Sequence, residues 1–278
     1  MHRLVWNTYF EIKQKLLNHG VVLSAQRAIE EDKVREVLSL LKPISVQESL
    51  IRLGGDGDGG YLVPDDLMGI EYCFSPGVCD YAPFEIDLER RGIKAFLADH
   101  SVVEPPKGLR ISEFIQKHIL AEDGAASITL SNWISRSVGE YEGDLLLQMD
   151  IEGSEYEVLL STDLDTLSRF RIMVIEFHGL HGLFDRAQFT LIKQVFAKLS
   201  ERFDVVHLHP NNFAPALRIG KIEIPDLMEI TFLRKDRNLT LGGPLAYPHP
   251  LDRQCSSARS DYPLPECWYW SQSATRIP

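Results

Sequence analysis

A continuous apolar run that ends abruptly in acids constrains this chain more than any other feature of its sequence. Leu145–Met149 carries four apolar residues and one glutamine, and Asp150, Glu152 and Gly153 follow closely. A run of this length is typical of a strand buried on both faces in a parallel α/β sheet, where ligands bind at the carboxyl ends of the strands. Asp150 and Glu152 are therefore candidate site residues. The alternative is a helix N-terminus, where Glu152 and Glu155 only favour the helix dipole.

The same order of strand, turn and helix occurs about seventy residues earlier. Tyr72–Ser75 is a short, mostly apolar run, Pro76-Gly77 is a turn dipeptide, and residues 82–91 have a helical pattern. A glycine here lets a cofactor approach the backbone, and the next helix offers free N–H groups at its start. The turn has only one glycine rather than a G-x-G-x-x-G motif, so it favours a nucleotide-type site only weakly.

A third strand-like run, Ile93–Ala98, ends in Asp99 and His100 about twenty residues after the glycine turn. An acid at this spacing is placed to accept hydrogen bonds from ribose hydroxyls. Asp99 is therefore the strongest single cofactor candidate. The alternative is a solvated aspartate at the end of a strand.

Strand-like and helix-like segments alternate through the middle of the chain, which predicts a mostly parallel sheet covered by helices on both faces. Residues 204–208 and 228–234, with no clear helix between them, suit an antiparallel edge hairpin with a long insert. The predicted strands number seven: residues 71–75, 94–98, 111–116, 144–149, 171–177, 204–208 and 228–234. The predicted helices between them are residues 82–91, 154–161 and 187–200.

Five segments, in their order and spacing, resemble the FkbM family of S-adenosylmethionine-dependent methyltransferases: Asp58–Pro64, Ser75–Val78, Leu97–His100, Gln148–Glu155 and Val174–His178. The resemblance covers roughly residues 50–235. It implies a class I methyltransferase fold, which is a Rossmann-like α/β sheet of seven strands. It also implies S-adenosylmethionine over the glycine turn with its ribose on Asp99, and methyl transfer to an oxygen, commonly of a sugar or a polyketide.

The cofactor-binding residues expected from this resemblance and from the strand ends are Ser75, Pro76, Gly77, Val78, Asp99, His100, Ser131 and Asp150. Two positions depart from the family pattern. Cys79 stands where another glycine is expected, and its side chain either crowds the cofactor or points away. Ser131 stands where family members often carry an aspartate near the adenine, which leaves the adenine contacts open.

Candidate catalytic residues follow the fourth to sixth predicted strands: Asp150, Glu176, His178 and His209. Methyl transfer from a sulfonium needs mainly an aligned acceptor and a base that removes its proton. His178 and His209 are candidate bases because histidine titrates near neutral pH, while His178 in a structural hydrogen bond to a carboxylate is the alternative. His207 alternates with His209 and is the expected core histidine. Glu152, Asn211 and Asn212 are candidate substrate contacts, with a turn as the alternative for the asparagines.

A divalent metal is a competing mechanism that the sequence does not favour. Asp150, Glu176 and His178 or His209 could bind Mg²⁺ or Mn²⁺ together with an acceptor diol, but no contiguous ligand motif is present. The four cysteines show neither a C-x-x-C pair nor zinc-like spacing, so no metal ligand is assigned and a reducing cytoplasm is expected.

The formal net charge of −11 argues against nucleic acid or an anionic membrane as the main partner, and a small-molecule or glycan acceptor fits better. No secretion signal and no membrane span are expected. Two other classes remain as alternatives. A nicotinamide-dependent oxidoreductase lacks support because the glycine fingerprint and a Tyr-x-x-x-Lys pair are not evident; a nonenzymatic nucleotide-binding module would keep the turn and Asp99 without an acceptor pocket.

Three regions are expected along the chain: a helical extension over residues 1–45, a methyltransferase domain over 46–238 and an irregular, proline-rich tail over 239–278. The extension and the tail either pack on the domain or join subunits of a homo-oligomer, and Trp268-Tyr269-Trp270 is the expected docking segment. The loop Gly54–Gly60 precedes the strand-like run Tyr61–Val63. The loop resembles a calcium loop only superficially, and the family likeness puts it near the cofactor entrance.

Overall fold

The computed structural model describes residues 14–15, 27–237 and 245–269. Seven strands form one sheet in the order β10-β13-β9-β8-β3-β4-β5, in which every pairing is parallel except those of β13 with its two neighbours. The mostly parallel sheet predicted from the sequence is thereby confirmed. The strands are β3 (Tyr72–Pro76), β4 (Lys94–Ala98), β5 (Glu113–Ile115), β8 (Leu145–Met149), β9 (Phe170–Phe177), β10 (Phe203–Pro210) and β13 (Met228–Arg234).

The last two strands of the sheet pair antiparallel, as predicted, but only one of them lies at the edge. β13 is inserted between β9 and β10, so its amino end lies beside the carboxyl ends of its neighbours. The chain between β10 and β13 contains a small hairpin of β11 (Leu217–Ile219) and β12 (Ile222–Ile224). This arrangement brings residues from the start of β13 to the edge of the sheet where parallel strands place ligands.

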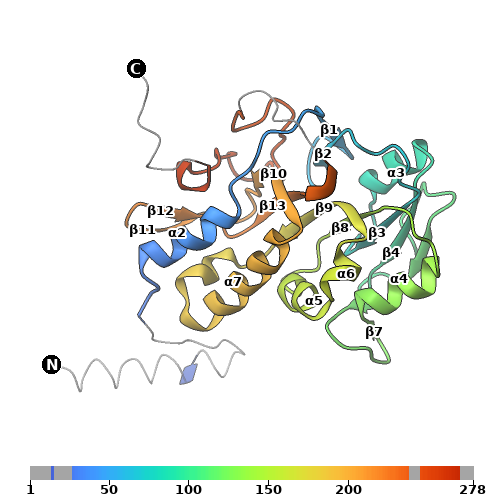
Figure 1. Cartoon of the computed structure of the whole chain (residues 1–278), viewed down its shortest axis with the longest axis horizontal. Helices are drawn as coiled ribbons and strands as arrows, with labels where there is room; N and C mark the ends of the chain where they lie inside the picture. Colours follow the sequence, from blue (N-terminus) through green and yellow to red (C-terminus); the bar gives the residue numbers. More distant parts are fainter. Residues whose placement is uncertain (1–13, 16–26, 238–244, 270–278) are drawn as a thin grey trace.

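One face of the sheet is covered by helices that Figure 1 shows side by side in front of it. Their apolar faces share a core with the residues of β8 and β9 that point to this side, including Leu147 and Met173. Thr129 caps α4 through its side chain, and Leu130, Trp133 and Ile134 form its buried face, a helix that was not predicted. The helices are α2 (Glu31–Leu40), α4 (Leu130–Val138), α5 (Glu155–Ser161), α6 (Leu164–Leu167) and α7 (Arg186–Ser200), with a 3-10 turn, η1 (Leu180–Phe184), before α7.

The opposite face is covered by α3 (Pro83–Arg90) and by a hairpin of β1 (Leu50–Leu53) and β2 (Tyr61–Pro64). The prediction had included only the second strand of this hairpin, because a loop of seven residues, rich in glycine, separates the two. Thr231 in β13 donates a hydrogen bond to the carbonyl of Leu62 at 2.7 Å, which ties the hairpin to the sheet. A short parallel pair, β6 (His118–Ile119) with β7 (Ser127–Ile128), lies outside the main sheet.

The described parts of the terminal regions pack on this sheet and its helices. In α2, Val34, Val37 and Leu38 are buried in the core that contains α7, and Trp268 in η3 (Glu266–Trp268) is buried in the same core. Most of the predicted extension, and Trp270, lie outside the described residues. Among the helices that are described, none is both long and apolar enough to span a membrane.

Candidate functional site

The turn after β3 is held tightly between the ends of two other strands. Gly77 has a φ of +86°, and a Cβ atom built on it would lie 1.5 Å from the carbonyl oxygen of Asp150. Its N–H donates to the carbonyl of Ala98 at 2.9 Å, while the N–H of Asp150 donates to the carbonyl of Pro76 at 3.1 Å. Only glycine fits here, because both the backbone conformation and the space exclude a side chain. The close approach fixes Asp150 beside the turn.

A cavity of about 260 Å³ opens over this turn. Three residues that the sequence assigned to the cofactor site line it: Gly77, Val78 and Asp150. The other five are not among its lining residues: Ser75, Pro76, Asp99, His100 and Ser131. Asp58, from the loop between β1 and β2, also lines the cavity. This is the loop that was expected near the cofactor entrance. The acids in the lining are Asp58, Asp80, Glu85 and Asp150, and the described lining includes no lysine, arginine or histidine.

Ser75 lies beneath the cavity in a buried hydrogen-bond chain. Its hydroxyl contacts both a carboxylate oxygen of Glu85 and the side-chain oxygen of Gln148, and Gln148 donates to the hydroxyl of Tyr61 at 3.3 Å. One hydroxyl carries one proton, so it can donate to only one of these two acceptors. Burial raises the pKa of Glu85, so a protonated Glu85 that donates to Ser75 satisfies the chain. Ser75 therefore supports the floor of the cavity from below.

Asp99 ends β4 with its carboxylate held by three hydrogen bonds. The N–H of Cys79 donates to one oxygen at 3.0 Å, and the N–H and hydroxyl of Ser101 donate to the other, each at 2.7 Å. Burial opposes the charge, but these bonds lower the pKa of Asp99, so it is ionised at neutral pH. One acceptor position remains on the oxygen that Cys79 contacts. Asp99 is thus a fixed acceptor beside the turn.

Cys79 has a φ of +50°, in the left-handed region that favours glycine, which agrees with the glycine expected there from the family pattern. Its side chain is exposed. His100 lies after Asp99 and stacks on His118 with ring centroids 4.3 Å apart. Ser131 lies in the first turn of α4, next to Leu130.

Asp150 and His178 meet at the carboxyl ends of β8 and β9 within a group of acids. The Nε2 atom of His178 lies 3.7 Å from Asp150 and 3.4 Å from the exposed Glu152, and its Nδ1 atom lies 3.1 Å from the buried Glu155. Burial alone lowers the pKa of His178, but the hydrogen bond to Glu155 and the charges of the three acids raise it to about 9. At neutral pH His178 is therefore an imidazolium that balances these carboxylates.

A row of three carboxylates crosses the sheet from β8 to β13. Glu176 in β9 is the register partner of Glu229 in β13, and Asp150 follows Met149, whose partner is Ile175. We call Asp150, Glu176 and Glu229 the carboxylate row. Burial raises the pKa of Asp150 to about 7, with His178 opposing the shift and nearby acids adding to it. Burial, followed by the charges of Asp150 and Glu229, raises the pKa of Glu176 well above its usual value. Residues at this edge thus hold protons near neutral pH.

Glu229 had not been predicted, although it is central to the row. Its Oε2 atom lies 2.8 Å from Nδ1 of His209, its register partner in β10, and its Oε1 atom accepts a hydrogen bond from Cys255 at 3.2 Å. Burial lowers the pKa of His209, but Glu229 raises it to about 9. The prediction considered only acids that follow strands, whereas Glu229 begins an antiparallel strand. Glu229 could have been found by expecting the antiparallel strand to start at the edge where the parallel strands end.

Asn211 and Asn212 are buried, and their side chains already have partners. Asn211 donates to Glu176 at 2.9 Å. Asn212 donates to the carbonyls of Ser256 and Arg259 at 2.8 and 2.9 Å, and accepts from the N–H of Ser256 at 2.7 Å. Asn211 orients a member of the carboxylate row, whereas Asn212 fastens the segment that carries Cys255.

His207 is buried and paired with Asp252 at 2.8 Å, in keeping with a structural role.

A family comparison finds a similarity in the central part of the chain. The family model for the methyltransferase FkbM domain matches residues 126–203, a range that contains β8, β9, Asp150, Glu176 and His178. This match confirms the resemblance to the FkbM methyltransferase family drawn from the sequence. No curated protein matches the chain.

Solved structures of three methyltransferases are similar to the chain at low identity. A TehB-like S-adenosylmethionine-dependent methyltransferase from Corynebacterium glutamicum is 11% identical over 82% of this chain and 97% of its own, with a TM-score of 0.33. Magnesium protoporphyrin IX methyltransferase from Synechocystis, with bound S-adenosylmethionine, is 12% identical over 61% and 72%, with a TM-score of 0.27. A prophage-encoded protein from E. coli, described as a DNA modification methyltransferase, is 11% identical over 62% of this chain at a TM-score of 0.39, and the match spans 49% of its length.

Proposed function

We propose that this protein is an S-adenosylmethionine-dependent methyltransferase that transfers a methyl group to a hydroxyl oxygen of a sugar, a glycan or another small molecule. The observation that carries the proposal is the cavity over the glycine turn, bounded by Asp150 and carrying acids but no basic residue in its described lining. The FkbM match gives the reaction class. The sheet supports a class I, Rossmann-like fold, because β3 and its neighbours β4 and β8 form a switch point where such folds bind cofactors.

The charge of the cavity favours S-adenosylmethionine over a phosphate-bearing cofactor. The sulfonium and ammonium groups of S-adenosylmethionine are cations, and Asp58, Asp80 and Asp150 are acids in the lining. A pyrophosphate would meet these acids with no lysine or arginine from the described lining to offset its charge. The same argument disfavours a nicotinamide-dependent oxidoreductase and a nucleotide-binding module.

In the proposed complex, the backbone of Gly77 and Val78 lies against the cofactor and the ionised Asp99 accepts hydrogen bonds from the ribose hydroxyls. When bound, S-adenosylmethionine supplies a methyl group on a positively charged sulfur that is already activated as a leaving group. Asp150 lines this cavity and is also the first member of the carboxylate row. An acceptor over Glu176 and Glu229 therefore has Asp150 beside it.

Asp150 is the proposed general base. A pKa of about 7 puts it near the optimum for accepting a proton at neutral pH. His178 and His209, the candidates from the sequence, each have a pKa of about 9 and already carry a proton at neutral pH. Carboxylate and amide oxygens accept hydrogen bonds from hydroxyl groups, so the row and Asn211 suit a polyhydroxylated acceptor such as a sugar. Glu152 remains a proposed acceptor contact because it is exposed next to His178.

Calorimetric titration with S-adenosylhomocysteine tests the cofactor assignment without knowledge of the acceptor. We expect stoichiometric binding, and Asp99→Ala should weaken it by about 1–3 kcal/mol, the range for losing hydrogen bonds to a charged group. Asp32→Ala, an exposed acid on α2, is the matched control and should bind as the wild type does. Equal affinity of all three proteins would overturn the role of Asp99.

Labelled S-adenosylmethionine and a panel of glycans, free sugars and small hydroxylated molecules then test the reaction. Transfer of label to an oxygen supports the proposal. Binding of a nicotinamide cofactor in place of S-adenosylhomocysteine would contradict it. A cytoplasmic location, and a homo-oligomer formed through the N-terminal helices or the C-terminal tail, stay predictions from the sequence.

A further inference from the structure

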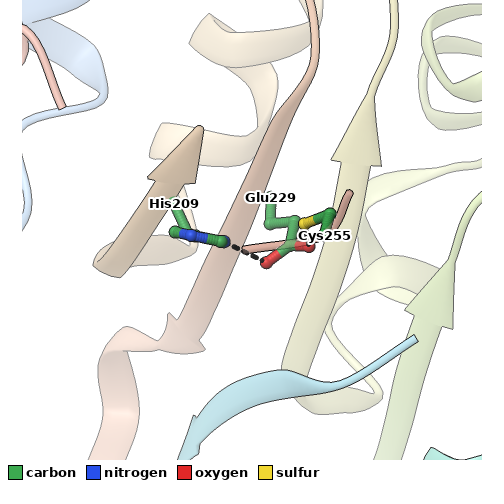
Figure 2. Close-up of side chains that lie close together, drawn as sticks. All are labelled: His209, Glu229 and Cys255. Carbon is green, nitrogen blue, oxygen red and sulfur yellow. Dashed lines mark hydrogen bonds and ion pairs between the residues drawn. The ribbon is translucent and has the colours of Figure 1, made fainter. Parts of the chain in front are cut away.

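Three side chains of different chemistry converge at the Glu229 end of the carboxylate row. His209 comes from β10, Glu229 from β13 and Cys255 from the segment that Asn212 fastens, and Figure 2 shows Glu229 between the other two. One ligating atom from each lies within 4.8 Å of those of the others. An imidazole, a carboxylate and a thiol in one small volume form a typical ligand set for a divalent transition metal.

Two buried atoms here have no hydrogen-bond partner among the described residues: Nε2 of His209 and Oε2 of Glu176. Both residues are 3% exposed. A buried polar atom without a partner is unfavourable, so a ligand that supplies a partner would stabilise this edge of the sheet. Glu176 is the register partner of Glu229, so these two side chains are neighbours on adjacent strands. The unpartnered oxygen of Glu176 therefore points to a ligand that a carboxylate oxygen can bind.

The charge at this place favours a cation. Glu229, Glu176 and Asp58 are acids close enough to raise the pKa of the Cys255 thiol, after burial. Among the described residues, His209 is the basic side chain paired with Glu229, with no lysine or arginine in an ion pair to Glu229 or Glu176. A divalent ion would offset the negative charge of several carboxylates at once.

We propose that His209, Glu229 and Cys255 bind a thiophilic divalent metal ion of the zinc class, at a site next to Glu176. Thiolate is a soft ligand that selects zinc and related ions over magnesium or calcium. Bonds of about 2.0 Å to nitrogen and oxygen and about 2.3 Å to sulfur are required. The contact of 2.8 Å between His209 and Glu229 is a hydrogen-bonded distance, and it opens by about half an ångström when a tetrahedral ion replaces the proton.

Protons must leave when the ion binds. A metal is bound by the thiolate form of cysteine and by a ring nitrogen of histidine that carries no proton. Coordination by a thiolate and a neutral imidazole therefore releases one proton from each. The apparent affinity should rise with pH for this reason.

The test uses Cd²⁺ as a probe on the full-length protein after chelation, because a cadmium–thiolate bond gives an ultraviolet charge-transfer band. We expect one equivalent of Cd²⁺ to produce the band in the wild type and Cys255→Ser to abolish it. Cys267→Ser and Cys79→Ser remove other thiols and should retain it, which makes them matched controls. His209→Gln should keep the band but weaken Cd²⁺ binding by at least about tenfold.

The absence of the band in the wild type, or its persistence in Cys255→Ser, would overturn the proposal and leave a buried ion pair of His209 and Glu229. Circular dichroism should show that each variant is folded, and His209→Gln gives an independent measurement if Cys255→Ser is not. Binding of S-adenosylhomocysteine, measured on the same samples, distinguishes failure of this site from failure of the proposed methyltransferase function.

Discussion

The cofactor cavity and the carboxylate row lie side by side, but their polar groups are satisfied to different degrees. Around the cavity, Asp99 accepts three hydrogen bonds from Cys79 and Ser101, and its pKa is lowered. In the row, Glu176 has an oxygen without a partner among the described residues, and its pKa is raised. The protein itself supplies the hydrogen bonds that fix Asp99, whereas the free oxygen of Glu176 gains a partner when a ligand binds. We therefore expect substitutions in the row to affect catalysis or ion binding, and substitutions around the turn to affect cofactor binding and folding.

The largest expected effect separates catalysis from cofactor binding at Asp150. Asp150→Asn removes the proposed base and should lower kcat by about 10²–10⁴-fold. Its affinity for S-adenosylhomocysteine should change far less, because the backbone of the turn is unaltered. In the wild type, kcat should rise as the pH increases through about 7, as Asp150 ionises. Rates from labelled S-adenosylmethionine across this pH range check both points.

Glu157→Gln is the control for this substitution, since Glu157 is exposed on α5. Full activity of Asp150→Asn at all pH values would assign the base elsewhere and remove the proposed distinction between the two regions.

A substitution in the turn should mainly damage folding. Gly77→Ala introduces a Cβ into the backbone of Asp150 and keeps a φ of +86°. The left-handed conformation costs about 1–2 kcal/mol and overpacking a further 1–3 kcal/mol, so the free energy of unfolding should fall by about 2–5 kcal/mol. Urea unfolding measures this change, and calorimetry should show weaker cofactor binding.

Gly92→Ala has a similar φ of +80° with no atom within 4 Å of its Cβ, so it should cost only the conformational strain, about 1–2 kcal/mol. Equal losses in the two variants would mean that the approach of Asp150 to the turn is not tight.

The charge of His178 predicts a pH dependence of stability. Its pKa in the folded protein, about 9, is above the ordinary histidine value of 6.5, so the folded state holds the proton more tightly. The stabilisation is fully present below about pH 6.5 and is lost as the pH rises towards 9. Between these values the wild type should lose on the order of 1–3 kcal/mol more unfolding free energy than His178→Gln. Urea unfolding at both ends of the range checks this, and parallel curves would refute it.

The smallest effect is expected beneath the cavity. If Glu85 is protonated, Glu85→Gln should change the free energy of unfolding by less than about 1 kcal/mol, because an amide can replace the donor. Ser75→Ala should cost about 1–3 kcal/mol, since it leaves Glu85 and Gln148 without their shared partner. Thermal unfolding compares the two. A larger loss in Glu85→Gln would show that this carboxyl is ionised.

The sheet was predictable because its central strands are continuous apolar runs. β4 has the predicted bounds, and β8 and β9 begin within one residue of them. Such runs are buried on both faces of a sheet, so the residues of each run are enough to predict a central strand. The hairpin of β1 and β2 was incomplete in the prediction, because its two strands are short and a long glycine loop separates them. Its stability comes from packing on the sheet, as in the contact of Leu62 with Thr231.

The turn, Asp150 and Asp99 were identified from positions that follow strands directly, and the structure brings Gly77 and Asp150 together. The protonation states of His178 and His209 could not be predicted, since they depend on Glu155 and Glu229. Glu155 follows Asp150 closely in the chain, but its burial is a tertiary property.

By itself, the sequence determined the parallel sheet, the glycine turn and the acids at the strand ends, because these depend on local apolar runs and on the few residues that follow them. Only the tertiary structure decided that Glu229, His209 and Cys255 meet. They converge because an antiparallel strand starts where its parallel neighbours end, and because Asn212 fastens a distant segment beside it. Cross-strand register and long-range burial set their charges, and neither can be read from spacing along the chain.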